Sequence, residues 1–221
     1  KLDEFEEKFS TYHDCKFGIG VGNCTDAITI ALKAFDIGPG DEVITTSNTA
    51  VPTVTAIVNT GASVKFVDIN KYSLIDVNKI ENSINKNTKA IIPVHLYGQM
   101  CEMDKIMQIA SKHNLKVIED CAQSHGATYK NKKAGSIGDV GCYSFYPTKI
   151  FGAYGDGGFI TTNNEELFDR MKRIRFLGME KKKMSSGHWN GKYYAIEHGT
   201  NSRLDEVHAA ILLKKFPYLD E

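Results

Sequence analysis

The sequence alternates between short apolar runs and stretches of helical periodicity, which limits the folds open to the chain. Runs typical of buried strands are separated by stretches in which apolar residues recur every three or four positions. The strand-like runs cover residues 41–46, 63–69, 89–96, 115–120, 140–145 and 157–162, and the helix-like stretches cover 26–35, 54–61, 103–113 and 165–178. This alternation predicts a three-layer α/β/α fold, with helices on both faces of a mixed, mainly parallel sheet.

The C-terminal segment, residues 202–221, is also expected to form a helix, ended by a proline. Its apolar positions recur at helical spacing and predict one buried face. These positions are Leu204, Val207, Ala210, Ile211 and Leu212.

Charge and hydropathy exclude several classes of partner. Lysine plus arginine number 27, as do aspartate plus glutamate, so the formal net charge is zero. No overall field favours nucleic acid or a membrane surface, and a phosphate-bearing ligand would need a local site. The apolar runs are far shorter than the ~20 residues of a membrane span, and the N-terminus is too charged for a secretory signal. We expect a cytoplasmic protein with a small-molecule partner.

The cysteines argue against disulfides and metals. They are odd in number, scattered and without a C-x-x-C pair, which predicts neither a disulfide framework nor a structural zinc site. They are Cys15, Cys24, Cys101, Cys121 and Cys142. His95 and His125 could touch a substrate, but no cysteine or carboxylate lies at ligand spacing from them in the sequence. No metal is therefore predicted.

Two polar groups follow strand-like runs, where ligands of open α/β sheets bind. Asp120 ends the run 115–120, and Ser144 ends the next strand, five residues before Lys149 and a Gly-rich turn. A lysine between a strand end and such a turn can be desolvated, which lowers its pKa and favours a role as amine nucleophile and proton shuttle. Taken alone, however, Asp120 is more often a cap or an ion-pair partner, and Lys149 a solvated lysine.

A third signal is a glycine-rich stretch before the first predicted helix. The free N–H groups at Cys24 and Thr25 could bind a phosphate at the helix start. A dinucleotide-binding module is the rival interpretation, but Asn23 occupies the third glycine position of its G-x-G-x-x-G fingerprint. A Walker A loop is also missing.

Five blocks together resemble the DegT/DnrJ/EryC1/StrS family of sugar aminotransferases, of fold type I. The blocks are GNCTDAI, PVHLYGQ, VIEDCAQSHGA, SFYPTKIFGAYGDGG and NSRLDEVHAAI, and the resemblance covers roughly residues 5–216. It implies that residues 1–221 are the large domain of a pyridoxal 5'-phosphate (PLP) enzyme. That enzyme would transfer an amino group from L-glutamate to a nucleotide-linked keto-sugar, as a homodimer. Family chains also carry an N-terminal segment and a smaller C-terminal domain, so we expect this chain to be a fragment.

The resemblance assigns roles to the residues that the patterns single out. It implies that Lys149 forms the internal Schiff base with PLP and that Asp120 pairs with the protonated pyridine nitrogen. Gln123 is similar to a residue that lies near the ring and its 3-hydroxyl oxygen. The position expected to stack a flat side chain on the ring holds Ala50 instead, a departure from the family pattern.

The resemblance also implies a phosphate site and an intersubunit contact. Ser144, with the backbone and hydroxyl at Cys24 and Thr25, would hold the phosphate. Asn201 is similar to an asparagine that can reach the cofactor of the partner subunit.

Several alternatives stay open at this point. One is a catalytically silent, PLP-binding regulatory protein, and another is a different fold type I enzyme. Some family members carry histidine at the Schiff-base position and act as dehydratases, but Lys149 favours transamination. The segment 180–194 is expected to be a surface loop, with nucleotide recognition through Trp189 as the alternative interpretation.

Overall fold

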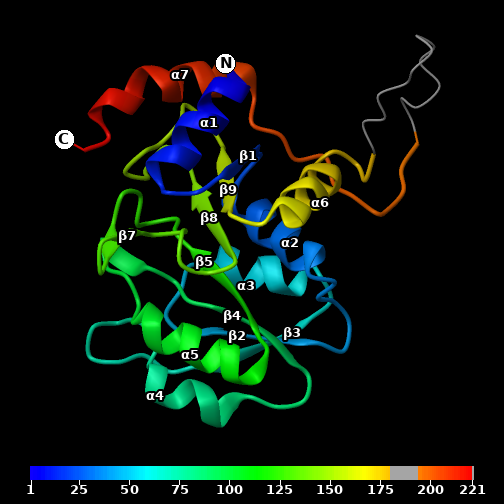
Figure 1. The fold of residues 1–221 in the computed structure, drawn as a ribbon, viewed down its shortest axis with the longest axis vertical. Coiled ribbons are helices and arrows are strands. Elements are labelled where there is room, and N and C mark those ends of the chain that lie inside the picture. The colour runs from blue at the N-terminus through cyan, green and yellow to red at the C-terminus, as the bar shows by residue number, and fades with distance from the viewer. Residues whose placement is uncertain (180–193, 221) are drawn as a thin grey trace.

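A computed structural model describes residues 1–179 and 194–220 and contains one seven-stranded sheet (Figure 1). The strand order is β1-β9-β8-β5-β4-β2-β3. The strands are β1 Phe17–Val21, β2 Glu42–Thr46, β3 Ser63–Val67, β4 Thr88–Ile92, β5 Lys116–Asp120, β8 Val140–Ser144 and β9 Gly158–Thr162. Only β9 runs antiparallel to its two neighbours, β1 and β8. The predicted mixed, mainly parallel sheet is confirmed.

Helices cover both faces of this sheet and complete the predicted three layers. They are α1 Leu2–Tyr12, α2 Cys24–Ala34, α3 Val51–Val58, α4 Val77–Ile80, α5 Met103–His113, α6 Glu165–Arg175 and α7 Glu206–Lys215. Short 3-10 helices cover Glu81–Ser83, Leu96–Gly98 and Phe216–Tyr218, and a small hairpin pairs β6 (Thr128–Tyr129) with β7 (Lys132–Lys133). No helix among the described residues is long and apolar enough to cross a membrane.

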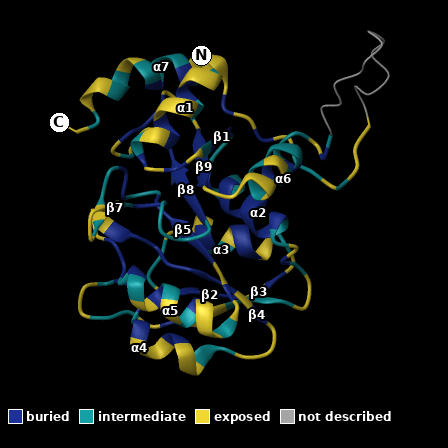
Figure 2. Cartoon of the chain, in the orientation of Figure 1, coloured by how far each residue is buried: buried dark blue, intermediate teal, exposed yellow. Residues whose placement is uncertain are grey.

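Two buried clusters lie on opposite faces of the sheet, because successive strand residues point to opposite sides. In β4, Ile91 joins the cluster beneath α1, α4, α5 and α7, whereas Ile92 joins the cluster beneath α2, α3 and α6. In β5, Val117 and Ile118 divide in the same way. Figure 2 shows the central strands as the buried centre of the molecule, with exposed residues on the outer faces of the helices and on the edge strand β3.

The sequence patterns did not predict β1 or α1. β1 contains Gly18 and Gly20, which lower strand propensity, but both glycines are required by the packing. A Cβ at Gly18 would lie 2.5 Å from the ring of Phe159, and one at Gly20 would lie 2.9 Å from Leu2 and Leu204. The sheet edge thus accepts α1 and the segment before α7 only because these side chains are missing.

The C-terminal helix forms as predicted, but its buried face differs. α7 begins at Glu206, and its buried residues are Ala209 and Leu212, which lie on the side that contacts α1. Val207 is 68% exposed. The expected single apolar face is therefore wrong for this residue, because the contact with α1 selects a neighbouring face of the helix.

Candidate active site

The carboxyl ends of β1, β5 and β8 bring the predicted residues to one edge of the sheet. Asp120 is the last residue of β5 and Ser144 the last of β8. Ser144 pairs with Gly158, the first residue of β9, which also pairs with the last residue of β1. A Cβ at Gly158 would lie 2.8 Å from the amide nitrogen of Cys24, so the start of α2 packs directly against this point. The carboxyl ends of β1 and β8 and the start of α2 therefore lie next to one another.

Asp120 is a buried carboxylate without a cationic protein partner. It is 5% exposed; its Oδ2 accepts a hydrogen bond from Thr53 Oγ1 at 2.7 Å, and its Oδ1 accepts one from the Ala122 amide at 3.1 Å. No described residue forms an ion pair with it. Burial raises the pKa of Asp120, while these hydrogen bonds and the nearby Lys149 lower it. A cationic ligand atom at this carboxylate would be strongly favoured.

Thr53 is a site residue that sequence reasoning missed. It lies on α3 and is 1% exposed. Its position after β2 follows the same rule that drew attention to Asp120, since α3 begins beyond the carboxyl end of that strand. Ala50 directly precedes α3 and is exposed, which agrees with a place at this edge of the sheet.

Lys149, in the turn after β8, acts on this carboxylate through its charge. Its amide donates to the Tyr146 carbonyl at 2.9 Å in the turn after β8, and the residue is half-buried. The Lys149 ammonium opposes the effect of burial on the pKa of Asp120 and of the Cys24 thiol. Both groups therefore lie within range of its charge.

The glycine-rich loop after Lys149 is held at both ends and against α7. The Phe145 amide donates to the Gly157 carbonyl at 2.7 Å, which closes the loop. Lys215 of α7 donates from Nζ to the Gly152 carbonyl. These contacts limit the motion of the segment that carries Lys149.

The start of α2 offers unpaired N–H groups. The Asn23 side chain caps the helix by accepting from the Asp26 amide at 2.8 Å. The Cys24 and Thr25 amides have no acceptor among the described residues. Helix N-termini with free N–H groups bind phosphate well. Ser202, which the sequence analysis also missed, fixes this turn: its Oγ donates to Asp26 Oδ2 at 2.7 Å and accepts from the Gly22 amide at 2.9 Å.

Two predicted residues, Gln123 and Asn201, contact other segments in the structure. Gln123 Oε1 accepts a hydrogen bond from the Tyr97 amide at 3.0 Å, so the side chain supports the turn at residues 96–98. Tyr97 is 75% exposed and has a positive φ of 59°. Asn201 is exposed and forms a bridge with Phe176. Trp189, predicted as a possible nucleotide contact, is among residues 180–193 and lies outside the described residues.

His95 belongs to the fold and not to this site. Its ring is fully buried and its Nε2 lies 2.9 Å from Glu119 Oε2. The sequence suggested no ligand near His95, but the fold brings Glu119 and Cys121 beside it. Glu119 is already saturated, since it also accepts from the amides of residues 135, 137 and 138 at 2.7 to 3.1 Å. The hydrogen bonds of Glu119 with His95 and with the amides of residues 135, 137 and 138 form a buried polar cluster, which we call the Glu119 clamp.

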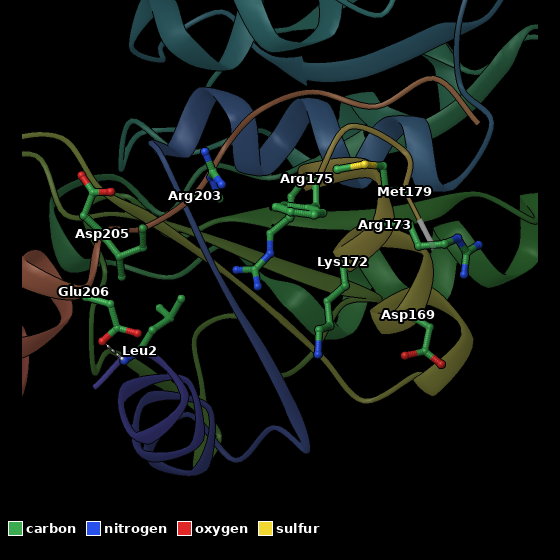
Figure 3. Close-up of a pocket in the computed structure, with 11 residues that line it drawn as sticks. Leu2, Asp169, Lys172, Arg173, Arg175, Met179, Arg203, Asp205 and Glu206 are labelled. Carbon is green, nitrogen blue, oxygen red and sulfur yellow. Dashed lines mark hydrogen bonds between the residues drawn. The ribbon is translucent and has the colours of Figure 1, made fainter. Parts of the chain in front are cut away.

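A separate cavity of about 770 Å³ lies between α6, the segment before α7 and the start of α1 (Figure 3). Its cationic side chains are partly paired: Arg175 contacts Glu6 at 2.9 Å and Arg173 contacts Glu197 at 3.0 Å. None of the predicted cofactor residues lines it.

Comparison with known proteins gives one consistent result. The model of the DegT/DnrJ/EryC1/StrS aminotransferase family matches residues 1–221. The dTDP-3-amino-3,6-dideoxy-alpha-D-galactopyranose transaminase of Aneurinibacillus thermoaerophilus is 51% identical over 100% of this chain and 58% of its own length. A pleiotropic regulatory protein of Geobacillus stearothermophilus is 49% identical over 99% of this chain and 56% of its own length.

A solved structure also matches this chain. NtdA from Bacillus subtilis, crystallised with bound cofactor PMP, superposes with a TM-score of 0.89 at 40% identity, over 99% of this chain and 48% of its own. The chain thus spans about half the length of the proteins it matches.

Proposed function

Because this chain belongs to the DegT/DnrJ/EryC1/StrS aminotransferase family, we propose that residues 1–221 form the PLP-binding large domain of a nucleotide-sugar aminotransferase. The amino donor is L-glutamate and the acceptor a nucleotide-linked keto-sugar. The observation that carries the proposal is the convergence of Asp120, Lys149, Ser144 and the start of α2 at one sheet edge. Relatives named as nucleotide-sugar transaminases support the acceptor class.

The residues at this edge fit PLP. Asp120 is a desolvated carboxylate without a cation, and a protonated ring nitrogen would supply one. The free amides of Cys24 and Thr25, with the hydroxyl of Ser144, offer donors for a phosphate. The PMP-bound structure of NtdA supports the choice of cofactor, since PMP is the aminated form of PLP.

The chain's own residues would divide the work as follows. Bound PLP supplies an electron sink for negative charge that develops at the substrate carbon carrying the amino group. Asp120 keeps the proton on the ring nitrogen, because a buried carboxylate favours a cation beside it. The Lys149 amine anchors the cofactor and, once free, moves a proton to and from that carbon. The start of α2 and Ser144 fix the phosphate and thereby the orientation of the ring.

We further propose that the protein is a cytoplasmic homodimer. In it, Asn201 contacts the cofactor of the partner subunit, and Gln123 lies near the 3-hydroxyl oxygen of the ring. The exposure of Asn201 is compatible with an intersubunit contact. Gln123 keeps its amide NH2 available, because only its Oε1 bonds to Tyr97 among the described residues.

Reduction of the PLP complex tests the proposal. The protein is mixed with PLP, treated with borohydride and digested, and the pyridoxyl-bearing peptide is identified by mass spectrometry. We expect the label on Lys149, no label in Lys149→Ala, and normal labelling in Lys112→Ala, which removes an exposed lysine of α5. L-Glutamate should bleach the visible absorbance of bound PLP before reduction. Labelling elsewhere, or none, would reject the proposed role of Lys149.

A second candidate is a PLP-binding regulatory protein without turnover. The observation that favours it is the 49% identity to the relative named as a pleiotropic regulatory protein. Such a protein would bind PLP at Lys149, but L-glutamate would leave the visible absorbance unchanged. The glutamate step of the same experiment therefore separates the two candidates.

A further inference from the structure

Two adjacent buried residues, Ser124 and His125, have polar atoms that no described residue satisfies. Ser124 is fully buried and His125 is 7% exposed. Ser124 Oγ and both ring nitrogens of His125 have no hydrogen-bond partner in the part of the chain that the structure describes. Unpaired buried polar atoms are rare in native proteins, so each calls for a physical reason.

The surroundings of the His125 ring offer apolar contact but no donor. The ring centroid lies 5.8 Å from that of Tyr143, 6.0 Å from that of Phe145 and 6.4 Å from that of Phe9. The Tyr143 hydroxyl already donates to the Ala134 carbonyl at 2.6 Å. Packing alone would be served as well by phenylalanine or leucine, without leaving two nitrogens unpaired.

His125 is neutral, which fixes what it can do. Burial lowers the pKa of His125 to about 4, with a smaller contribution from the Lys149 ammonium and against the opposing effect of the Ser144 backbone. His13, the other buried histidine nearby, is also neutral, because burial lowers its pKa to about 3. A neutral imidazole carries one nitrogen that accepts a hydrogen bond and one that donates. At neutral pH, His125 therefore offers a buried acceptor.

Lys149 can supply a hydrogen-bond donor to this acceptor, because its charge acts on the His125 ring. Its charge acts on the pKa of His125, Asp120 and Cys24. Among the described residues, Lys149 Nζ has no hydrogen-bond partner of its own. A lysine ammonium carries three donors on a flexible stem and can turn toward an acceptor. The buried, unpaired nitrogens of His125 lie beside Phe145, at the end of β8 from which the turn to Lys149 begins, and within range of the Lys149 charge.

We propose that His125 is a positioning residue for Lys149: its unprotonated ring nitrogen accepts a hydrogen bond from the Lys149 amine and holds that amine at the ends of β5 and β8. The inference rests on the proposed function, because it extends the role of Lys149. His125 takes no proton from the substrate and acts only through the lysine. Asp120 and His125 together would then set the direction from which the amine approaches.

Nitrogen NMR of the histidine rings tests this contact without cofactor. Long-range proton–nitrogen spectra of histidine-labelled, PLP-free protein report the tautomer and the hydrogen bonding of each ring nitrogen. We expect the acceptor nitrogen of His125 to change its shift in Lys149→Met, while the ring of His113, bonded to Glu81, serves as the unchanged internal control. Identical His125 shifts in both proteins would overturn the proposal.

The pKa of the Lys149 amine gives a second readout, measured from the pH dependence of its acylation rate in PLP-free protein. His125→Leu should shift that pH dependence to lower pH, because the acceptor that stabilises the ammonium is gone. His125→Gln keeps an acceptor and should reverse most of this shift. An unchanged Lys149 pKa in His125→Leu would reduce His125 to a packing residue.

The two proposals fail in different ways. If PLP does not label Lys149, the proposed function fails, while the NMR and acylation results in PLP-free protein still stand. If PLP labels Lys149 but neither readout responds to the His125 or Lys149 variants, only the positioning role is rejected. Should His125→Leu not fold, the spectra of the unaltered protein and of Lys149→Met decide alone.

Discussion

The buried clamp around Glu119 makes a quantitative prediction. Both carboxylate oxygens of Glu119 are saturated: Oε2 lies 2.9 Å from His95 Nε2 and 3.1 Å from the Gly135 amide, and Oε1 accepts from the Ile137 and Gly138 amides at 2.8 and 2.7 Å. Glu119→Gln keeps the shape of the side chain but replaces one oxygen by an NH2 group. In either orientation of the new amide, two of the four buried donors then face its NH2 group, which is itself a donor.

The magnitude follows from the number of bonds lost. Two hydrogen bonds to a charged acceptor disappear, at about 1.5 to 3 kcal/mol each, so the free energy of unfolding should fall by about 3 to 6 kcal/mol. The His95 ring cannot compensate by changing its tautomer, because its Nδ1 accepts from the Cys101 amide at 3.3 Å. For a chain of 221 residues, such a loss lowers the melting temperature by roughly 6 to 24 °C.

Urea unfolding monitored by circular dichroism measures this loss. The matched control is Glu102→Gln, which removes an exposed partner of Lys105 and should change the free energy of unfolding by at most about 1 kcal/mol. If Glu119→Gln behaves like the control, Glu119 is protonated in the folded protein or its donors find other acceptors. Either result would refute the ionised clamp.

Three further changes probe the site. Burial lowers the pKa of His125 to about 4, so its contribution to stability is complete above the unfolded-state value near 6.5 and is lost as the pH falls; urea titrations at pH 7 and 4 should show about 3 kcal/mol that His125→Phe lacks. Gly158→Ala would place a methyl 2.4 Å from the backbone at the start of α2, and we expect PLP affinity, measured by fluorescence titration, to fall at least about tenfold, or 1.4 kcal/mol. Thr53→Val removes one donor to Asp120; because this bond lowers the pKa of Asp120, NMR should find a higher Asp120 pKa in the variant.

Local patterns predicted the buried elements of this fold well, because periodicity records which face of an element is covered. The run 103–113 coincides with α5, and the run 115–120 contains β5. Asp120 and Ser144 could be singled out because parallel strands deliver their last residues to one edge. The order of these signals along the chain then carried the resemblance to a family.

The rest depended on contacts between distant segments. β1 was missed because its two glycines weaken the local strand signal, and only the packing of α1, Phe159 and Leu204 against them explains their presence. Thr53 reaches Asp120 across 67 positions of sequence, and His95 reaches Glu119 across 24. Spacing within one element cannot reveal such pairs. The exposed Val207 shows the same limit, since a helix with several apolar residues can bury more than one face.

Glu119 and Asp120 show why neighbouring carboxylates acquire different roles. Both are buried at the end of β5, but successive strand residues point to opposite faces. On one face the fold supplies four donors, and Glu119 becomes part of the structure. On the other face Asp120 receives two hydrogen bonds and no cation, while burial raises its pKa. An acceptor that the protein leaves partly unsatisfied favours a ligand that carries a positive charge. The different roles of Glu119 and Asp120 depend on the donors that distant segments bring to each carboxylate. The local sequence alone therefore cannot distinguish the two roles.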